Sequence, residues 1–454
     1  MHPVVVAEDQ VYRFVPAENG AGPMWCSGST CLVRLGDHLL ATGLETLEDC
    51  KPLHNCRWML FRRDNSGWQL VERDRVHRTR EPTPLACFAD GRLFLSANPT
   101  LVTDPDASAG PSRPEILEFS AADPAAPFRT LLPAWAGKPD FTEHSYRSLA
   151  ADGHRHELIL FQNVGDTHAA WAFLDSTGTW ARSGELAWPW GAEYDTPQPI
   201  RVCYPNVALH DGAVHFCGVS DIVEPYEAWR AHKREITGRH WDYDFRRLFY
   251  TWSPDIRSGQ FADWVEISSR DATCGWITPG DLWLAPDGAV HIVWSERAID
   301  ERLRERFFPG AVQSHALNYA VLRQGQVVHR SSLVAAKEGQ SDEIPSAPRF
   351  HVTPEGRLFV LYYLSPSLSV SGSGSGSDGG GTPVSENRIL EISAGRSAGP
   401  SVRIPLQEPL TRFFTATTRA GSAPSNVIDL LGTPAGEGRI CYAQVRLDAD
   451  PAIS

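Results

Sequence analysis

One short phrase recurs seven times along the chain, and it sets the strongest limit on the fold. Apolar residues run up to a turn that combines glycine with an acidic residue, and a second apolar run follows. The phrase begins at Cys31, Leu85, Leu149, Val207, Leu282, Phe350 and, more loosely, Val427. An acidic residue beside glycine between two apolar runs is a strong β-hairpin signal. Repetition at roughly 50–80 residues is typical of a repeat architecture, with about one propeller blade per period.

Each phrase is followed by further apolar runs, so that each repeat supplies the three or four short strands of one blade. The last repeat ends near Leu447 with too few strands, whereas the apolar stretch from Val4 to Phe14 precedes the first repeat and has no repeat of its own. We therefore predict an all-β fold, a seven-bladed β-propeller. Its N-terminal strand closes the last blade and removes free sheet edges. We expect one domain over residues 1–454.

Two insertions and one Ser/Gly run interrupt the repeats. Residues 220–247 and 296–314 each contain a predicted short helix, and both fall between the second and third strands of a blade. The Ser/Gly run at 371–381 predicts a mobile loop. Long connections in compact domains are often functional, so the two helical insertions are candidates to cover a site.

Composition argues against several classes of function. The formal net charge of −13 disfavours a nucleic-acid binder. No apolar run approaches the roughly 18–20 residues of a membrane span, and the first residues do not form a signal peptide. Nine cysteines in so long a chain do not indicate a disulfide scaffold. We expect a monomer that binds neither nucleic acid nor membrane and is cytoplasmic, or secreted with its signal removed.

The first strand of each propeller blade lines the central channel. The loops that lead into this strand share one face with the loops between the second and third strands, so residues of all blades converge there. The candidate substrate-binding residues on this face are Trp25, His54, Arg57, Tyr146, His168, Asn206, His240, Tyr243, Trp276, Arg297, His315 and Arg349. Aromatic rings stack on sugars and arginine pairs with carboxylate or sulfate, which favours an anionic oligo- or polysaccharide.

Four residues on this face are candidates for catalysis: His144, Tyr204, Arg147 and Arg201. His144 and Tyr204 stand at the start of the predicted innermost strands of adjacent blades. A histidine with a pKa of about 6.5 can accept a proton at neutral pH, and a tyrosine with a pKa of about 10 can donate one. With an arginine to neutralise a uronate carboxylate, these residues could remove the proton beside that carboxylate, the first step of β-elimination.

Acidic residues on the same face leave a second chemistry open. They are Glu45, Glu48, Asp49, Asp221 and Glu296. Two carboxylates about 5–10 Å apart would make a glycoside hydrolase, although nothing in the spacing selects a pair. A propeller that binds a glycan without cleaving it is a third alternative, and a protein-interaction scaffold is a fourth.

A soft-ligand cluster raises the question of a metal. Cys50, His54 and Cys56, with Cys26 as a possible fourth, have the residue types of a zinc site but lack a Cys-x-x-Cys pair. We favour buried small hydrophobes over ligands for most cysteines. We expect no cofactor, and a structural or catalytic divalent metal stays an open alternative.

Several short motifs resemble those of known propellers. Asp64-Asn-Ser-Gly-Trp and Asp175-Ser-Thr-Gly-Thr-Trp resemble degenerate Asp-box turns of sialidase-type, BNR-repeat propellers. The phrases around His144 and Tyr204 are similar to strand starts in seven-bladed propellers that degrade uronate-containing glycans, such as ulvan lyases and rhamnosyl-glucuronate-cleaving enzymes.

The resemblance implies a base and acid pair of histidine and tyrosine with a neutralising arginine in the channel mouth. His144, Tyr204 and Arg147 or Arg201 occupy comparable phrases. A sialidase would need an arginine triad that includes an N-terminal Arg-Ile-Pro. The tripeptide here begins at Arg403, near the C-terminus, which argues against a sialidase.

Overall fold

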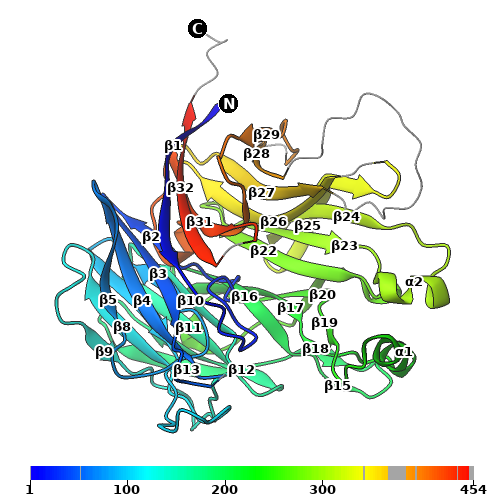
Figure 1. Ribbon diagram of the computed structural model, residues 1–454, viewed down its shortest axis with the longest axis horizontal. Coiled ribbons are helices and arrows are strands. Elements are labelled where there is room, and N and C mark those ends of the chain that lie inside the picture. Colours follow the sequence, from blue (N-terminus) through cyan, green and yellow to red (C-terminus); the bar gives the residue numbers. More distant parts are fainter. Residues whose placement is uncertain are drawn as a thin grey trace.

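The computed structural model describes residues 2–51, 53–340, 343–366, 385–393, 396–436 and 438–448. The Ser/Gly run at 371–381 lies outside the described residues. Seven four-stranded antiparallel sheets follow one another along the chain and are arranged as blades around an axis (Figure 1). The prediction of an all-β, seven-bladed propeller is confirmed.

The first four blades are given from the innermost to the outermost strand. Blade 1 contains β2 (Leu32–Leu35), β3 (His38–Thr46), β4 (Cys56–Asp64) and β5 (Gly67–Arg73). Blade 2 contains β6 (Leu85–Cys87), β7 (Arg92–Ala97), β8 (Glu115–Ser120) and β9 (Arg129–Leu131). Blade 3 contains β10 (Arg147–Asp152), β11 (Glu157–Val164), β12 (His168–Leu174) and β13 (Trp180–Ala187). Blade 4 contains β16 (Val202–His210), β17 (Ala213–Ser220), β20 (Arg247–Ser253) and β21 (Val265–Ser269).

The remaining blades follow the same order. Blade 5 contains β22 (Trp276–Leu284), β23 (Val290–Arg297), β24 (Ser314–Arg323) and β25 (Gln326–Lys337). Blade 6 contains β26 (Glu343–Val352), β27 (Leu358–Pro366), β28 (Glu386–Ile392) and β29 (Val402–Ile404). Blade 7 contains β30 (Leu410–Thr415), β31 (Val427–Pro434), β32 (Arg439–Asp448) and β1 (His2–Arg13).

Several short elements lie outside the seven four-stranded sheets. Two small sheets pair β14 (Trp190–Gly191) with β15 (Gln198–Pro199) and β18 (Ile222–Val223) with β19 (Tyr243–Asp244). The helices are α1 (Glu227–Thr237) and α2 (Glu301–Phe307), with the 3-10 turns η1 (Ile256–Ser258), η2 (Asp271–Thr273) and η3 (Thr418–Ala420). In the described ranges, neither helix has the length and apolar composition that crossing a bilayer would require.

Closure of the ring follows the prediction. β1 pairs antiparallel with β32, from His2 opposite Asp448 to Arg13 opposite Arg439. Figure 1 shows the two strands side by side, the blue N-terminal strand against the red C-terminal one. The N-terminal strand is thus the outermost strand of blade 7. The ends of the chain are therefore joined through one sheet, which leaves the edge of β32 paired.

Six of the seven repeated phrases form the hairpin between the first and second strands of a blade, as expected. In blade 4 the turn is Asp211-Gly212, with positive φ values of 51° and 78°. Two consecutive residues with positive φ match the twist of the strands they connect. The seventh phrase differs, because it joins β31 to β32, the second and third strands of blade 7. The innermost strand of that blade is β30, and η3 lies between β30 and β31.

The seven innermost strands contact one another in a closed ring, in the order β2, β6, β10, β16, β22, β26 and β30. Apolar side chains fill the space between neighbouring blades. Between blades 3 and 4, for example, Trp171 and Phe216 belong to one buried cluster. Because each inner strand is wedged between two others, the strand starts of all blades are held at one end of the axis.

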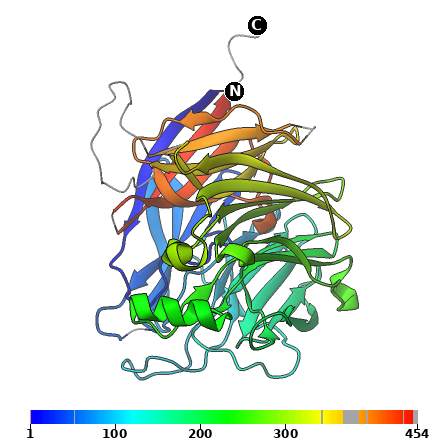
Figure 2. The ribbon, with the colours of Figure 1, turned by 90° about the vertical axis from the view of Figure 1, so that its right-hand side faces the viewer.

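The two insertions lie beside each other at the edge of this end. Figure 2 shows α1 and α2 close together, and the two helices are in contact. Buried charges connect them: Nζ of Lys233 in α1 lies 2.7 Å from Oε2 of Glu224 and 3.6 Å from Oδ2 of Asp300, the N-cap of α2. Arg246 donates to Glu224 as well, at 2.8 and 2.9 Å. Both predicted helices are therefore present, between the second and third strands of blades 4 and 5.

Candidate active site

A cavity of about 450 Å³ opens at the end of the axis where the innermost strands begin. Five of its side chains come from five blades: Trp25 precedes β2, Tyr204 lies in β16, Trp276 begins β22, Arg349 lies in β26 and Arg412 lies in β30. We call this space the axial cavity. It lies on the face predicted from the sequence.

Irregular strand starts shape the axial cavity. The pairing of β16 with β17 shifts between Cys203 and Asn206, which leaves Tyr204 in a bulge with a φ of 49°. β26 has a similar shift, and Ala347 there has a φ of 51°. Non-glycine residues in this conformation are strained by about 1–3 kcal/mol and concentrate at functional sites. Gly28 packs on the bulge, since an added Cβ would lie 2.5 Å from the backbone oxygen of Tyr204.

Four aromatic rings from three blades form a cluster beside the axial cavity, and of the four only Trp25 and Tyr204 line it. Trp25 stacks on Tyr146 with ring centroids 4.7 Å apart. The ring of Tyr146 lies 5.0 Å from that of His144 and 5.1 Å from that of Tyr204. The structure therefore brings His144 and Tyr204, the candidate base and acid, into contact with the same ring, that of Tyr146. The four residues lie at or before the starts of the innermost strands of blades 1, 3 and 4, so their rings meet at one end of the axis.

Two charged residues of one loop face the ring of His144. Oε1 of the fully buried Glu81 lies 3.2 Å from Nδ1 of His144, and Nη1 of Arg80 lies 2.5 Å from the same nitrogen. Glu81 also accepts hydrogen bonds from the backbone N–H and the hydroxyl of Ser145, at 2.8 and 2.7 Å. Glu81 requires Nδ1 to donate, whereas Arg80 requires it to accept. The two neighbours thus favour opposite tautomers of the imidazole.

The tyrosines of the cluster are kept in their protonated form. Burial raises the pKa of Tyr146 and that of Tyr204 well above the ordinary value, and the charge of Asp221 adds to both shifts. Asp221 is itself paired with Arg201, whose Nη2 lies 2.9 Å from Oδ2. The Arg201 guanidinium lies 5.5 Å from the centre of the Tyr146 ring. A protonated Tyr204 can donate a proton but cannot serve as a base at neutral pH.

The arginines around the axial cavity differ in what they are free to bind. Arg147 is 2% exposed and donates to the carbonyl of Pro82 at 2.6 Å, so it holds the backbone. Arg349 lines the cavity but donates to the carbonyls of Gly280 and Phe413, and burial lowers its pKa to about 10. Arg412 also lines the cavity, and its exposed guanidinium has no hydrogen bond or ion pair to any described residue.

Arg412 is the functional candidate that sequence reasoning missed. The seventh repeated phrase was assigned to the first two strands of its blade, and Leu410–Thr415 was not recognised as an innermost strand. If this phrase is instead placed between the second and third strands of the blade, Arg412 lies near the start of the innermost strand, as the candidate residues of the other blades do.

An arginine of blade 7 is bound by residues of three other blades and lines a cavity separate from the axial one. Arg419 in η3 pairs with Asp281 of β22, with Nη2 2.5 Å from Oδ1. Arg419 also donates to the carbonyls of Gly28 and Val207 and to the amide oxygen of Asn206. The predicted substrate-binding residue Asn206 does not line the axial cavity and instead accepts a hydrogen bond from this arginine.

A second cavity, of about 540 Å³, continues the first one outward between blades 5 and 6. The two cavities share Trp276, Thr278, Ser295 and Ser346. The second one contains the predicted residues Arg297 and His315. The Arg297 guanidinium lies 5.9 Å from the Trp276 ring, and burial lowers the pKa of His315. Together the cavities form a groove from the axis to the rim.

Other predicted binding residues lie outside both cavities. His54 is fully buried between blades 1 and 2 and contacts Thr100 at 3.5 Å. Arg57 pairs with Glu45 at 2.5 Å, and His168 lies 3.9 Å from Glu185 on the outer strands of blade 3.

The insertion of blade 4 carries the last two predicted binding residues. His240 is exposed there. Tyr243 lies 6.5 Å from Phe245, which lines the axial cavity. The exposed Tyr243 ring lies 5.9 Å from the Arg201 guanidinium. This insertion therefore reaches the rim of the site through Phe245.

None of the carboxylates proposed for hydrolysis lines the axial cavity as the structure describes it, but Glu296 lines the second cavity. Glu45 and Asp221 pair with arginines, and Glu296 accepts from Arg270 and Ser268, each at 2.5 Å. Glu48 and Asp49 are exposed on the loop after β3.

The soft-ligand cluster is not assembled into a site. In the described ranges, no group of three or more His, Cys, Asp or Glu side chains could hold a metal ion. Cys26 donates to the carbonyl of Pro82 at 3.5 Å, and Cys56 lies 3.6 Å from the amide nitrogen of Asn19.

The two Asp-box-like turns close the third and fourth strands of blades 1 and 3. Oδ1 of Asp175 accepts hydrogen bonds from the backbone N–H groups of Thr177 and Thr179, at 2.9 and 3.1 Å. Asp64 accepts from the backbone N–H of Ser66 in the same way, at 2.8 Å. These turns stabilise hairpins at the far end of the blades and take no part in the axial cavity.

No protein-family model and no curated protein matches the chain in sequence. Solved structures with a similar overall arrangement include an alpha-L-arabinanase of Penicillium chrysogenum complexed with arabinobiose, at 13% identity, a TM-score of 0.44 and coverage of 97% of this chain and 98% of that one. An alpha-L-arabinofuranosidase of Fusarium graminearum has 11% identity, a TM-score of 0.40 and coverage of 80% and 91%. A Trypanosoma rangeli sialidase has 10% identity, a TM-score of 0.39 and coverage of 74% and 52%. Likeness at this level assigns neither activity nor substrate to the chain.

Proposed function

We propose that the protein is a carbohydrate-active enzyme, a lyase that cleaves a uronate-containing glycan by β-elimination in the axial cavity. One observation carries the proposal: the described lining of this cavity combines aromatic rings with the unpaired guanidinium of Arg412 and contains no carboxylate. Aromatic faces bind sugar rings, and an unpaired arginine binds a carboxylate.

The base in this mechanism is His144. When its Nδ1–H donates to Glu81, Nε2 carries the lone pair and accepts the proton from the carbon that bears the carboxylate. Arg80 favours the other tautomer, so a substrate carboxylate that draws Arg80 away would free the base. Arg412 neutralises the substrate carboxylate and thereby makes this proton more acidic.

The acid is Tyr204, whose hydroxyl is protonated at neutral pH, as for an ordinary tyrosine, and burial raises its pKa further. The electron pair left by the abstracted proton forms the C4–C5 double bond while the C4–O bond breaks. The leaving oxygen takes the proton of Tyr204. Solvent then returns a proton to Tyr204 and removes one from His144, which restores the starting state.

A glycoside hydrolase fits the same residues less well. It needs two carboxylates flanking the scissile bond. The carboxylates that approach the axis, Glu81, Asp221 and Asp281, are each at most 1% exposed and are engaged by arginines or a histidine. Three more carboxylates, Glu296, Asp300 and Glu301, line the second cavity, and each of them is also paired with an arginine. We therefore favour elimination over hydrolysis.

An absorbance screen tests the proposal, because elimination creates a double bond conjugated to the carboxylate. We expect new ultraviolet absorbance with at least one of ulvan, glucuronans, pectins and rhamnose–glucuronate gums. His144→Ala and Tyr204→Phe should each lower turnover by at least about a hundredfold while the melting temperature stays nearly constant. Tyr363→Phe, in β27 and outside the lining, is the matched control.

Two results would count against a lyase. Cleavage without new absorbance would transfer the assignment to a hydrolase. Saturable glycan binding without cleavage would indicate a non-catalytic propeller.

A further inference from the structure

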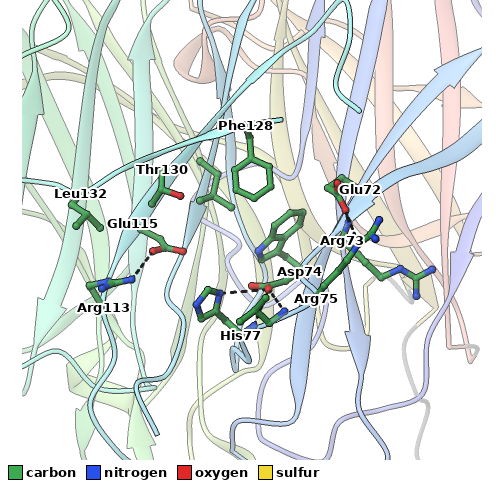
Figure 3. A pocket seen from close by; sticks show the side chains of 13 residues that line it. Glu72, Arg73, Asp74, Arg75, His77, Arg113, Glu115, Phe128, Thr130 and Leu132 are labelled. Atoms are coloured by element: carbon green, nitrogen blue, oxygen red, sulfur yellow. Dashed lines mark hydrogen bonds and ion pairs between the residues drawn. The ribbon is translucent and has the colours of Figure 1, made fainter. Parts of the chain in front are cut away.

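A separate groove of about 430 Å³ lies between blades 1 and 2. Figure 3 shows its two walls: the segment from Glu72 to His77, which follows β5, faces Arg113 and Glu115 at the start of β8. Phe128 closes one end between the walls. The end of β5 and the start of β8 both belong to the end of the blades that carries the axial cavity, so the groove lies at the rim of the same face.

One buried donor of this groove has no hydrogen bond, and one buried carboxyl group has a single arginine partner. Trp58 is 2% exposed, and its Nε1–H has no partner among the described residues. Glu115 is 4% exposed, and its only ion-pair partner in the described part of the chain is Arg113, with Nη2 at 3.5 Å. Burial raises the pKa of Glu115. An unsatisfied buried donor costs about 1–3 kcal/mol, and a ligand that accepts a hydrogen bond from Trp58 recovers this free energy.

The missing partners identify the chemistry of the ligand. Trp58 can only donate a hydrogen bond, whereas the Glu115 carboxylate accepts one. A hydroxyl group does both, so a ring with neighbouring hydroxyls satisfies the two residues together. Phe128 is 38% exposed and its centroid lies 6.0 Å from that of Trp58. It offers an aromatic face to the C–H side of such a ring.

The charges of the groove select a neutral ligand. Three arginines and three carboxylates line it: Arg73, Arg75, Arg113, Glu72, Asp74 and Glu115. A cation would satisfy Glu115 but leave the Trp58 donor unpaired, and an anion would face Glu115. We propose that this groove binds a neutral sugar unit of a glycan. The proposal does not depend on catalysis in the axial cavity.

The test measures binding of neutral linear pentasaccharides of glucose, xylose, arabinose, mannose and galactose by calorimetry, with the whole chain. We expect at least one to bind, and Phe128→Ala and Glu115→Gln each to weaken it by at least about tenfold. The matched control is Val328→Ala, a 47% exposed apolar side chain of β25 in blade 5. The melting temperature of each variant shows that it folds.

Arg412→Ala separates this groove from the axial cavity. We expect it to leave binding of the neutral pentasaccharide unchanged, even where it abolishes cleavage of a uronate glycan. Failure of all five sugars to bind, or equal binding by wild type and both groove variants, would overturn the proposal. Loss of binding in Arg412→Ala alone would place the sugar in the axial cavity and would equally overturn it.

Discussion

Arg419 shows how one residue can hold several blades. Its guanidinium reaches backbone or side-chain oxygens of blades 1, 4 and 5 from a turn in blade 7. It is 4% exposed, and its partner Asp281 is 1% exposed. Removal of one member of such a pair leaves an uncompensated buried charge, which is far more costly than loss of the pair as a whole.

We therefore expect Arg419→Met to lower the free energy of unfolding by about 3–5 kcal/mol. The double variant Arg419→Met/Asp281→Asn should recover part of this loss, because no buried charge is left unpaired. Urea unfolding followed by tryptophan fluorescence measures both values. A single-variant loss below about 1 kcal/mol, or no recovery in the double variant, would show that the pair does not hold the blades together.

At the scale of elements, the insertion of blade 4 combines a helix with a buried carboxyl. Asp244 in β19 is 2% exposed, and burial raises its pKa to about 7 despite Arg246, whose Nε lies 3.4 Å away. Glu224 and Asp271 add to the rise, and Lys233 opposes it. Oδ1 of Asp244 accepts from Ser220 at 3.3 Å, whereas Oδ2 has no partner among the described residues. This arrangement suits a protonated carboxyl.

The pH dependence of stability follows from this shift. The unfolded pKa is about 3.9, so the contribution of Asp244 is complete below about pH 4 and is lost as the pH rises through 7. The asparagine in Asp244→Asn cannot ionise. The free energy of unfolding of this variant should therefore rise relative to that of the wild type, by up to about 1.4 kcal/mol for each pH unit from pH 4 to 7. Denaturant titrations across this range measure the gain.

Asp263→Asn, at an exposed position of the same blade, is the control and should show no such gain. If the Asp244→Asn difference does not change with pH, Asp244 is ionised throughout and its pairing with Arg246 outweighs burial.

The hairpins show which parts of the fold could be predicted from the sequence and which could not. Six hairpin phrases were assigned to the correct strand pair because glycine and acidic residues encode the turn locally. The seventh, at Val427, was displaced by one strand, since the connection before it is an eleven-residue loop with η3 instead of a tight turn. Because of this displacement, the sequence did not identify Arg412 as a residue of the site. No local signal distinguishes the first strand of a blade from the second when the turn between them is irregular.

At the scale of the molecule, the ring closes by hydrogen bonds between β1 and β32 and not by a covalent link. His2 stands opposite Asp448, so a short Gly/Ser linker could replace residues 449–454 and 1. New ends after Gly178, in the turn between β12 and β13, would make β13 the N-terminal outermost strand of blade 3. Blade 3 would then close as blade 7 now does.

We expect this circular permutant to fold with a melting temperature within a few degrees of the wild type, as measured by circular dichroism. A permutant opened at Leu160, in the fully buried middle of β11, should not fold. If the first permutant also fails, the β1–β32 pairing must form early in folding and is more than a final closure.

The sequence by itself determined the number of blades, the hairpin positions, the closing strand and the face on which a site could lie. These features depend on turn chemistry and on alternation within a few residues. It also placed His144, Tyr204 and Trp25 at the starts of innermost strands, where the structure gathers them around Tyr146.

Only the tertiary structure decided which charged side chains are free. Arg147 and Arg201 hold Pro82 and Asp221, whereas Arg412 remains without a partner among the described residues. Whether a charge is satisfied depends on partners that lie tens of residues away along the chain. The spacing of strands in the sequence does not identify these partners. The groove between blades 1 and 2 was hidden for the same reason, because Trp58 and Glu115 face one space only after two blades pack together.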